Sequence, residues 1–254
     1  MSSGGLFQAI GMTEVEPTIH PDKYEVMGSD MQVLTVSLSP GEMITCEPGA
    51  MMYMDPQVSA GVNCANCCSR CVSGEKCIQS DFTNNGRAPA LVGLTPNMPA
   101  KIIPLDLAAV PAKYRAKNGA FFASLGNAGI GFDFDCNPLT CCCGGQGCVR
   151  QTIHGDGVAF LAAMGTITTK TLEAGEVLIV DTSSLVAWES TALLGVRSAG
   201  GCCTCCCGGE GLFNTTLTGP GKVYFQSMSK EKFQAALSVA VQAQQMDRNG
   251  GGQQ

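Results

Sequence analysis

Charged and aromatic side chains are both scarce in this sequence. Asp, Glu, Lys and Arg make up only 14% of its 254 residues, and aromatic residues make up 6%. Long surface helices carry charged residues along their outer face, so this composition favours short strands and turns over such helices. The 32 glycines and 12 prolines point the same way. The chain is long enough to bury a substantial core.

Basic clusters and long apolar runs are also missing. The 15 Lys and Arg residues are outnumbered by 21 Asp and Glu residues, which gives a net charge of −6. Nucleic acid is therefore excluded as a partner, because phosphate binding needs clustered Lys and Arg. No apolar run reaches the roughly 18 residues of a membrane span. No Lys or Arg precedes Lys23, so neither a secretory signal nor a clear mitochondrial presequence is expected, and Ser2 excludes N-myristoylation. We expect a cytoplasmic protein.

Motifs of the common enzyme classes are absent as well. The sequence contains no phosphate loop, no H-E-x-x-H and no G-x-S-x-G. His20 and His154 are the only histidines, and His154 occupies a turn position that matches Thr83 and Thr218 in related segments. A nucleophile pair of Cys148 and His154 stays open, but no third group orients it. We expect a protein that is not an enzyme.

Cysteine is abundant. Fifteen of the 16 cysteines lie in or beside three clusters, and Cys46 stands alone. Cluster 1 contains Cys64, Cys67, Cys68, Cys71 and Cys77; cluster 2 contains Cys141, Cys142, Cys143 and Cys148; cluster 3 contains Cys202, Cys203, Cys205, Cys206 and Cys207. The segments that follow the clusters align without gaps, so that Phe82, Ile153 and Leu217 correspond. A unit that appears three times predicts an internally repeated fold.

Each predicted unit runs strand, turn, strand, cysteine loop, strand, Gly-rich turn, strand. The units occupy about residues 30–104, 105–169 and 170–228. An N-terminal leader (1–29), either loose or forming a short edge strand, precedes them, and a C-terminal helix with a disordered tail (229–254) follows. Such units bury their apolar faces together, so we predict one all-β, pseudo-threefold domain. Ser229 predicts the N-cap of a short helix that packs against the β body. Trp188, Met51, Met52 and Met54 fall in strands and are expected in the core or at an interface.

Several of these segments resemble the AIM24 family. They are EPGAMMYMD at 47–55, KIIPLDL at 101–107, GGEGLF at 208–213 and LTGPGKV at 217–223. The resemblance covers about residues 30–230 and implies a fold akin to the tryptophan RNA-binding attenuation protein, without implying RNA binding. The namesake in fungi belongs to the mitochondrial inner membrane, so the resemblance also implies a mitochondrial location. Family members have an apolar segment before the GGEG turn, whereas this chain has cysteines there in all three units.

Four interpretations of the clusters stay open. Cysteine is a small apolar residue and could simply fill partly buried loops. Adjacent cysteines near an apolar surface are typical acceptors of palmitate, and several acyl chains anchor a protein stably. Zinc or Cu(I) could bind thiolates, for which the best candidates are Cys64, Cys67, Cys68 and Cys71. Disulfides would require an oxidising compartment.

The sequence favours a non-enzymatic β scaffold that is peripheral to a membrane through three Cys-rich loops, with S-palmitoylation as the means of attachment. The alternative is a cytosolic thiolate metal-binding or redox protein that uses the same clusters. A membrane surface or a protein partner is expected, and a homo-oligomer stays open. The cofactor is unknown; none is required by the first hypothesis, and zinc or Cu(I) by the second.

Overall fold

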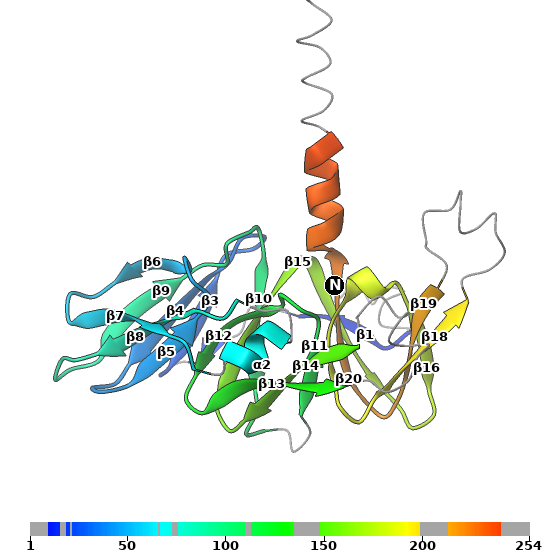
Figure 1. Cartoon of the computed structure of the whole chain (residues 1–254), viewed down its shortest axis with the longest axis horizontal. Helices are drawn as coiled ribbons and strands as arrows, with labels where there is room; N and C mark the ends of the chain where they lie inside the picture. The colour runs from blue at the N-terminus through cyan, green and yellow to red at the C-terminus, as the bar shows by residue number, and fades with distance from the viewer. Residues whose placement is uncertain are drawn as a thin grey trace, which may run out of the picture.

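The computed structural model describes residues 10–15, 19–20, 22–65, 67–72, 76–109, 113–134, 148–198 and 213–239. This part of the chain contains strands β1 to β20, the short helix α2 (Cys67–Val72), the 3-10 turn η1 (Thr182–Ser184) and a helix over residues 230–239. Strands β3 to β9 lie toward one end of the long axis in Figure 1, and β16, β18 and β19 lie toward the other. The predicted all-β fold is confirmed.

Most strands belong to three consecutive units of six strands. The first unit contains β4 (Val33–Leu38), β5 (Met43–Cys46), β6 (Met51–Met54), β7 (Val58–Asn63), β8 (Gln79–Asn84) and β9 (Ala90–Leu94). The second contains β10 (Lys101–Asp106), β11 (Tyr114–Ala116), β12 (Phe121–Leu125), β13 (Ala128–Phe134), β14 (Val149–Gly155) and the first part of β15 (Val158–Leu172). The third contains the second part of β15 and then β16 (Val177–Val180), β17 (Leu185–Glu189), β18 (Leu193–Ser198), β19 (Phe213–Thr218) and β20 (Gly221–Met228).

Alternation of apolar and polar side chains explains how the strands bury one face. In β4, Leu34, Val36 and Leu38 are fully buried, whereas Thr35 and Ser37 on the other face are partly exposed. Successive side chains of a strand point to opposite sides, so this pattern commits one face to the core. The core residues form three clusters along the chain, one for each unit.

Each unit pairs its strands in the same way. The second, fifth and fourth strands form one antiparallel sheet, in the orders β5-β8-β7, β11-β14-β13 and β16-β19-β18. The first, sixth and third strands form another, in the orders β4-β9-β6, β10-β15-β12 and β15-β20-β17. β15 serves twice because it ends the second unit and, after an irregularity between Met164 and Ile167, begins the third.

The registers of the three units agree residue by residue. Phe82, Ile153 and Leu217, which correspond in sequence, are all buried and pair with the equivalent strands β5, β11 and β16. The third strand of each unit carries a bulge at the same place, after Met51 in β6, Phe121 in β12 and Leu185 in β17. The repeated topology is therefore part of the structure. A threefold rotation that would relate the units stays a prediction.

Neighbouring units are joined by a strand pair. β5 of the first unit pairs with β12 of the second, and β11 of the second pairs with β17 of the third. These junctions merge most of the molecule into a 12-stranded sheet. They also close the cores, because Phe122 and Leu125 of the second unit pack into the first core and Val186 of the third packs into the second core.

The N-terminal segment adds strands to this framework. β2 (Ile19–His20) and β3 (Tyr24–Met27) extend the sheet of β4, β9 and β6 to five strands, and β1 (Met12–Glu14) pairs with β15. Tyr24 and Val26 are buried, and the Tyr24 ring stands edge-on to Phe160 with 5.0 Å between the ring centroids. Part of the expected leader is thus built into the β body.

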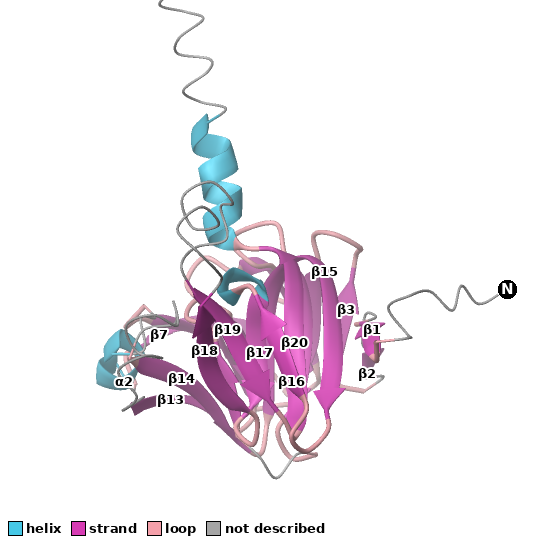
Figure 2. Ribbon diagram, turned by 90° about the vertical axis from the view of Figure 1, so that its right-hand side faces the viewer, coloured by secondary structure: helices cyan, strands magenta, loops and turns pink. Residues whose placement is uncertain are grey.

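The C-terminal helix begins where the sequence predicts. The Ser229 hydroxyl accepts a hydrogen bond from the Lys232 N–H at 3.2 Å, as an N-cap does. Among the described residues of this helix, only the first turn contacts the β body, through the ion pairs of Glu231 with Lys117 and of Lys232 with Asp181. The expected packing of the rest of the helix is wrong for the described residues, because all side chains of 230–239 except Phe233 are exposed. Figures 1 and 2 both show the helix rising away from the strands. Its outer apolar residues therefore find no partner in the described β body.

Candidate functional site

The three cysteine clusters fall at equivalent connections of the repeated fold. Each connects the fourth and fifth strands of its unit, whose last pairs are Asn63 with Gln79, Phe134 with Val149, and Ser198 with Phe213. The hairpins are therefore the same element used three times. The following candidates lie outside the described residues: Cys141, Cys142, Cys143, Cys202, Cys203, Cys205, Cys206 and Cys207.

Cluster 1 is built around α2, which carries Cys67, Cys68 and Cys71. Cys71 forms a disulfide with Cys77, with 5.7 Å between the Cα atoms. The sulfur atoms of Cys67, Cys71 and Cys77 all lie within 4.8 Å of one another. The spacing C-x3-C on one helical turn brings the first two together, and the return of the chain toward β8 brings the third. This sulfur triad is the closest gathering of metal-type ligands among the described residues.

The other two thiols of cluster 1 do not belong to the triad. Cys64 and Cys68 are exposed and not disulfide-bonded. Of the four expected metal ligands, the structure therefore brings together Cys67 and Cys71, and it adds Cys77 to them. Cys64 and Cys68 remain accessible at the surface for chemical modification.

Arg70 fastens this cysteine helix to the β body. Its side chain is 1% exposed, although it sits in the middle of the motif C-C-S-R-C. The guanidinium donates to the Lys76 carbonyl at 2.7 Å, pairs with the Glu47 carboxylate and lies 5.6 Å from the centre of the Phe121 ring. A guanidinium suits such a site because its planar fork forms several hydrogen bonds while its face stacks on an aromatic ring.

Arg70 is not among the residues that the sequence pattern singles out, because the cysteines around it dominate the segment. The available signal was an arginine flanked by cysteines in a chain with so little charge. Its partner Glu47 belongs to the turn between β5 and β6, so the ion pair joins α2 directly to the first junction. The position of cluster 1 is thereby fixed by a buried charge rather than by the disulfide alone.

The remaining described cysteines differ in kind. Cys46 is fully buried in β5, and burial, with Glu47 and Asp81 nearby, raises the pKa of its thiol to about 12. It is therefore a neutral packing residue at physiological pH. Cys148 is disulfide-bonded. His154 lies in β14 opposite Gly129 and is exposed. A free Cys148 thiolate paired with His154 is therefore not present in this structure.

Exposed apolar residues flank every cluster. Val62 and Ile78 border cluster 1, Phe134 precedes cluster 2 and Phe213 follows cluster 3. Phe134 is 65% exposed and Val62 is 74% exposed. Scattered apolar side chains are ordinary on a protein surface. Their recurrence beside three equivalent hairpin ends is the feature that bears on function.

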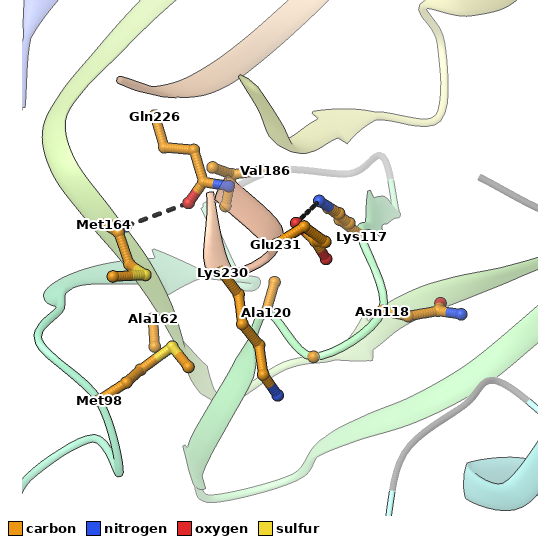
Figure 3. A pocket seen from close by; sticks show the side chains of 11 residues that line it. Met98, Lys117, Asn118, Ala120, Ala162, Met164, Val186, Gln226, Lys230 and Glu231 are labelled. Carbon is orange, nitrogen blue, oxygen red and sulfur yellow. Dashed lines mark hydrogen bonds and ion pairs between the residues drawn. The ribbon is translucent and has the colours of Figure 1, made fainter. Parts of the chain in front are cut away.

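A small pocket lies beneath the first turn of the C-terminal helix (Figure 3). Its volume is about 40 Å³, enough for water but not for a substrate of ordinary size. Lys117 and Glu231 line the pocket and pair with each other at 2.8 Å, and Lys232 of the same helix pairs with Asp181 at 2.6 Å. Partial burial raises the pKa of Asp181, but hydrogen bonds from Lys232 and Ser183 outweigh it and leave the pKa below its usual value.

No helix in the described ranges is long and apolar enough to cross a membrane. The family model described as "Mitochondrial biogenesis AIM24" matches residues 24–228. An uncharacterized protein of Streptococcus pyogenes serotype M6 is 30% identical over 167 residues, which are 65% of this chain and 64% of that protein, so this chain spans less than two thirds of its length. The crystal structure of a Streptococcus pyogenes protein matches with a TM-score of 0.67 and 25% identity, covering 86% of this chain and 99% of the other.

Proposed function

This chain belongs to the AIM24 family, and on that premise we propose that it is a non-enzymatic β scaffold held at a membrane surface by its three cysteine-bearing hairpins. The observation that carries the proposal is the recurrence of cysteines and exposed apolar residues at the fourth-to-fifth-strand connection of every unit. A residue pattern that merely filled the core would concentrate in the strands. This pattern concentrates at the hairpin ends.

Thioester formation is the chemistry that suits these cysteines. The Sγ of an exposed cysteine such as Cys64 or Cys68 attacks the carbonyl of a fatty acyl thioester, and the donor thiol leaves with the proton. One acyl chain holds a protein only weakly and reversibly. Several chains on one rigid body act together, so three clusters would give stable attachment. Flanking residues such as Phe134 and Phe213 would add apolar area at the interface.

Acyl exchange tests this proposal in the full chain isolated from its own cells. We expect hydroxylamine to release thiols for labelling, and membrane-recovered protein to decrease after the same treatment. Replacing the described cluster residues Cys64 and Cys68 by Ser should lower the label, and replacing all cluster cysteines should abolish it. Cys46→Ala is the matched control, because that thiol is buried and should contribute no label. Equal membrane recovery of the cluster-free variant and the native chain would contradict the proposal.

The sulfur triad favours a second candidate function, thiolate metal binding or redox chemistry at cluster 1. Three sulfurs within 4.8 Å suit a trigonal Cu(I) site, or a zinc site completed by a fourth ligand. The disulfide between Cys71 and Cys77 is the oxidised form, and its reduction consumes two electrons and two protons from a thiol reductant. The reduced triad would then be free to bind metal.

Metal analysis after reduction separates the two candidates. We expect the reduced full chain to bind one Cu(I) or Zn²⁺ per cluster 1, with loss on Cys67→Ser and retention on Cys68→Ser, which lies outside the triad. Thermal unfolding provides the second readout, since a bound metal raises Tm and a chelator reverses the rise. Equal metal content in both variants would exclude the triad as the binding site.

A further inference from the structure

Two edge strands at opposite ends of the molecule, β16 and β6, lack the partner strand that their equivalents have at the two junctions between units. Within the described strands, β16-β19-β18 forms a separate three-stranded sheet with β16 at its edge. The five-stranded sheet ends at β6. β16 is the equivalent of β5 and β11, and β6 is the equivalent of β12 and β17. Figure 1 places β6 and β16 toward opposite ends of the long axis.

The two formed junctions share one hydrogen-bond pattern. The Glu47 N–H donates to the Phe122 carbonyl at 2.9 Å across the first junction. The Lys117 N–H donates to the Val186 carbonyl at 2.8 Å across the second. Phe122 and Val186 are the residues passed over at the bulges of β12 and β17. The bulge therefore turns a carbonyl outward to the neighbouring unit in both cases.

The leftover edges carry the same two groups. Asp181 follows β16 as Glu47 follows β5 and Lys117 follows β11, and its carbonyl accepts the same turn hydrogen bond, from Ser184. Met52 is passed over at the bulge of β6. One edge thus offers the donor position and the other offers the acceptor position. A third junction of the same kind requires only that the two edges meet.

Both edges are apolar, and among the described residues neither is covered by another strand. All four side chains of β6 (Met51–Met54) are exposed, and Val177 and Ile179 of β16 are exposed as well. Natural proteins usually protect free edges with charge, proline or cover. The edge strand β10 contains Pro104 and the edge strand β18 contains Arg197. No charged residue or proline lies within β6 or β16. Asp55 and Pro56 follow β6. Asp55 is at the place that Glu189 occupies in the second junction, where Glu189 pairs with Tyr114, so a carboxylate at this place is compatible with pairing.

The cores point to the same missing neighbour. The first and second cores are each completed by residues from the following unit, as with Phe122 and Val186. The third core receives no residue from a following unit, and Leu178 and Val180 of β16 are only partly buried against it. A copy of β6 laid along β16 would cover this side of the third core.

We propose that β16 of one copy pairs antiparallel with β6 of a second copy of this chain, which repeats the internal junction between molecules. The expected opposite residues, carried over from the two internal junctions, are Leu178 with Asp55, Ile179 with Met54, and Val180 with Tyr53. Each copy has one β16 edge and one β6 edge, and a contact uses β16 of one copy and β6 of the other. The contact is therefore head-to-tail. Such contacts build a ring if the rotation between copies closes, and an open row if it does not.

The test uses the full chain in reductant, so that disulfides between chains cannot contribute. Light scattering with size-exclusion chromatography over a concentration series should show the native chain as dimers and larger species. Ile179→Lys blocks only the β16 edge and Met54→Lys blocks only the β6 edge, so each variant alone should be a monomer. Their equimolar mixture retains one intact pair of edges, and it should give a 1:1 dimer and nothing larger. Val62→Lys on the edge of β7 is the matched control and should assemble like the native chain.

Three results would overturn the proposal. The first is a native chain that stays monomeric throughout the series. The second is a single-edge variant that still forms dimers, since this indicates pairing of like edges or a different surface. The third is a mixture that stays monomeric while both variants keep the native circular dichroism and Tm. A photocrosslinking residue at position 179 tests the register, because it should label the peptide that contains Met54.

Discussion

Strands β6 and β12 occupy the same place in successive units but have opposite surroundings. Both bulge at the same point and both pair with the sixth strand of their unit. All five residues of β12 are buried, whereas all four of β6 are exposed. β12 has β5 of the preceding unit on its other side, and β6 has no described strand there.

The difference shows that burial follows the neighbour and not the position in the repeat. β17, which also meets a preceding unit, buries Trp188 completely at the place where β6 exposes Met54. Yet β6 keeps apolar residues as if a neighbour were present. An exposed strand that retains the composition of a buried one is what an assembling edge would show.

The largest expected effect concerns the buried member of the compared strands, Trp188 in β17. Trp188→Ala removes a large side chain from the third core and should lower the free energy of unfolding by about 3–5 kcal/mol. Met54→Ala, at the equivalent place in β6, should change it by about 0.5 kcal/mol or less in protein diluted to the monomer. Urea unfolding measures both. Similar losses for the two variants would mean that Met54 is covered in the monomer.

A second prediction compares two ion pairs. Glu47, which follows β5, pairs with Arg70, and Lys117, which follows β11, pairs with Glu231. Arg70→Ala removes a cation that is 1% exposed and pairs with the Glu47 carboxylate, which is 12% exposed, and should cost about 3 kcal/mol. Lys117→Ala breaks the pair with Glu231, whose carboxylate is 60% exposed, and should cost about 0–1 kcal/mol. Chemical unfolding of both variants tests the ranking, and Arg70→Lys should restore only part of the loss because it cannot reproduce the planar fork.

The smallest effect concerns the third such residue, Asp181. Its pKa and that of Glu231 both lie below their usual values in the folded protein, because hydrogen bonds from Lys232 and Lys117 outweigh partial burial. The stabilisation is therefore full above a pH of about 4 and is lost as the pH falls through the folded pKa values. Protection of the amides at 230–239, taken relative to their intrinsic exchange rate at each pH, should therefore decrease in that range. Asp181→Asn combined with Glu231→Gln should remove this pH dependence while Asn still caps η1.

Much of the fold could be predicted from the sequence, because corresponding apolar residues recur in all three units. The alignment of Phe82, Ile153 and Leu217 anticipated the shared register, and the alternating strand at 33–38 was visible directly. The pairing of units was not predictable, since a strand that will be buried on its other edge looks like one that will not. For the N-terminal segment the sequence allowed a short edge strand, but it did not locate β3 or its place between β2 and β4, because Tyr24 and Val26 provide only a short alternation.

The site was predictable in outline and not in detail. The cysteine clusters are visible in the sequence composition. The convergence of Cys77 with Cys67 and Cys71, in contrast, depends on the contact by which Arg70 holds α2 against Glu47. That contact joins residues whose proximity no local pattern specifies. The helix at 230–239 shows the converse limit, because Ser229 signals where it begins but no local pattern signals that it leaves the body.

The five-stranded sheet draws every strand from residues 19–94. A chain that emerges from the ribosome from its N-terminus can therefore complete this sheet before the second unit exists. β5 is the strand that must wait, because its partner β12 is made later, and β11 waits in turn for β17. The units are therefore synthesised and docked in the same order. When a new unit docks, it covers the exposed edge of the unit before it and adds an exposed edge of its own. The last edge in this order, β16, is the one that no strand among the described residues pairs with.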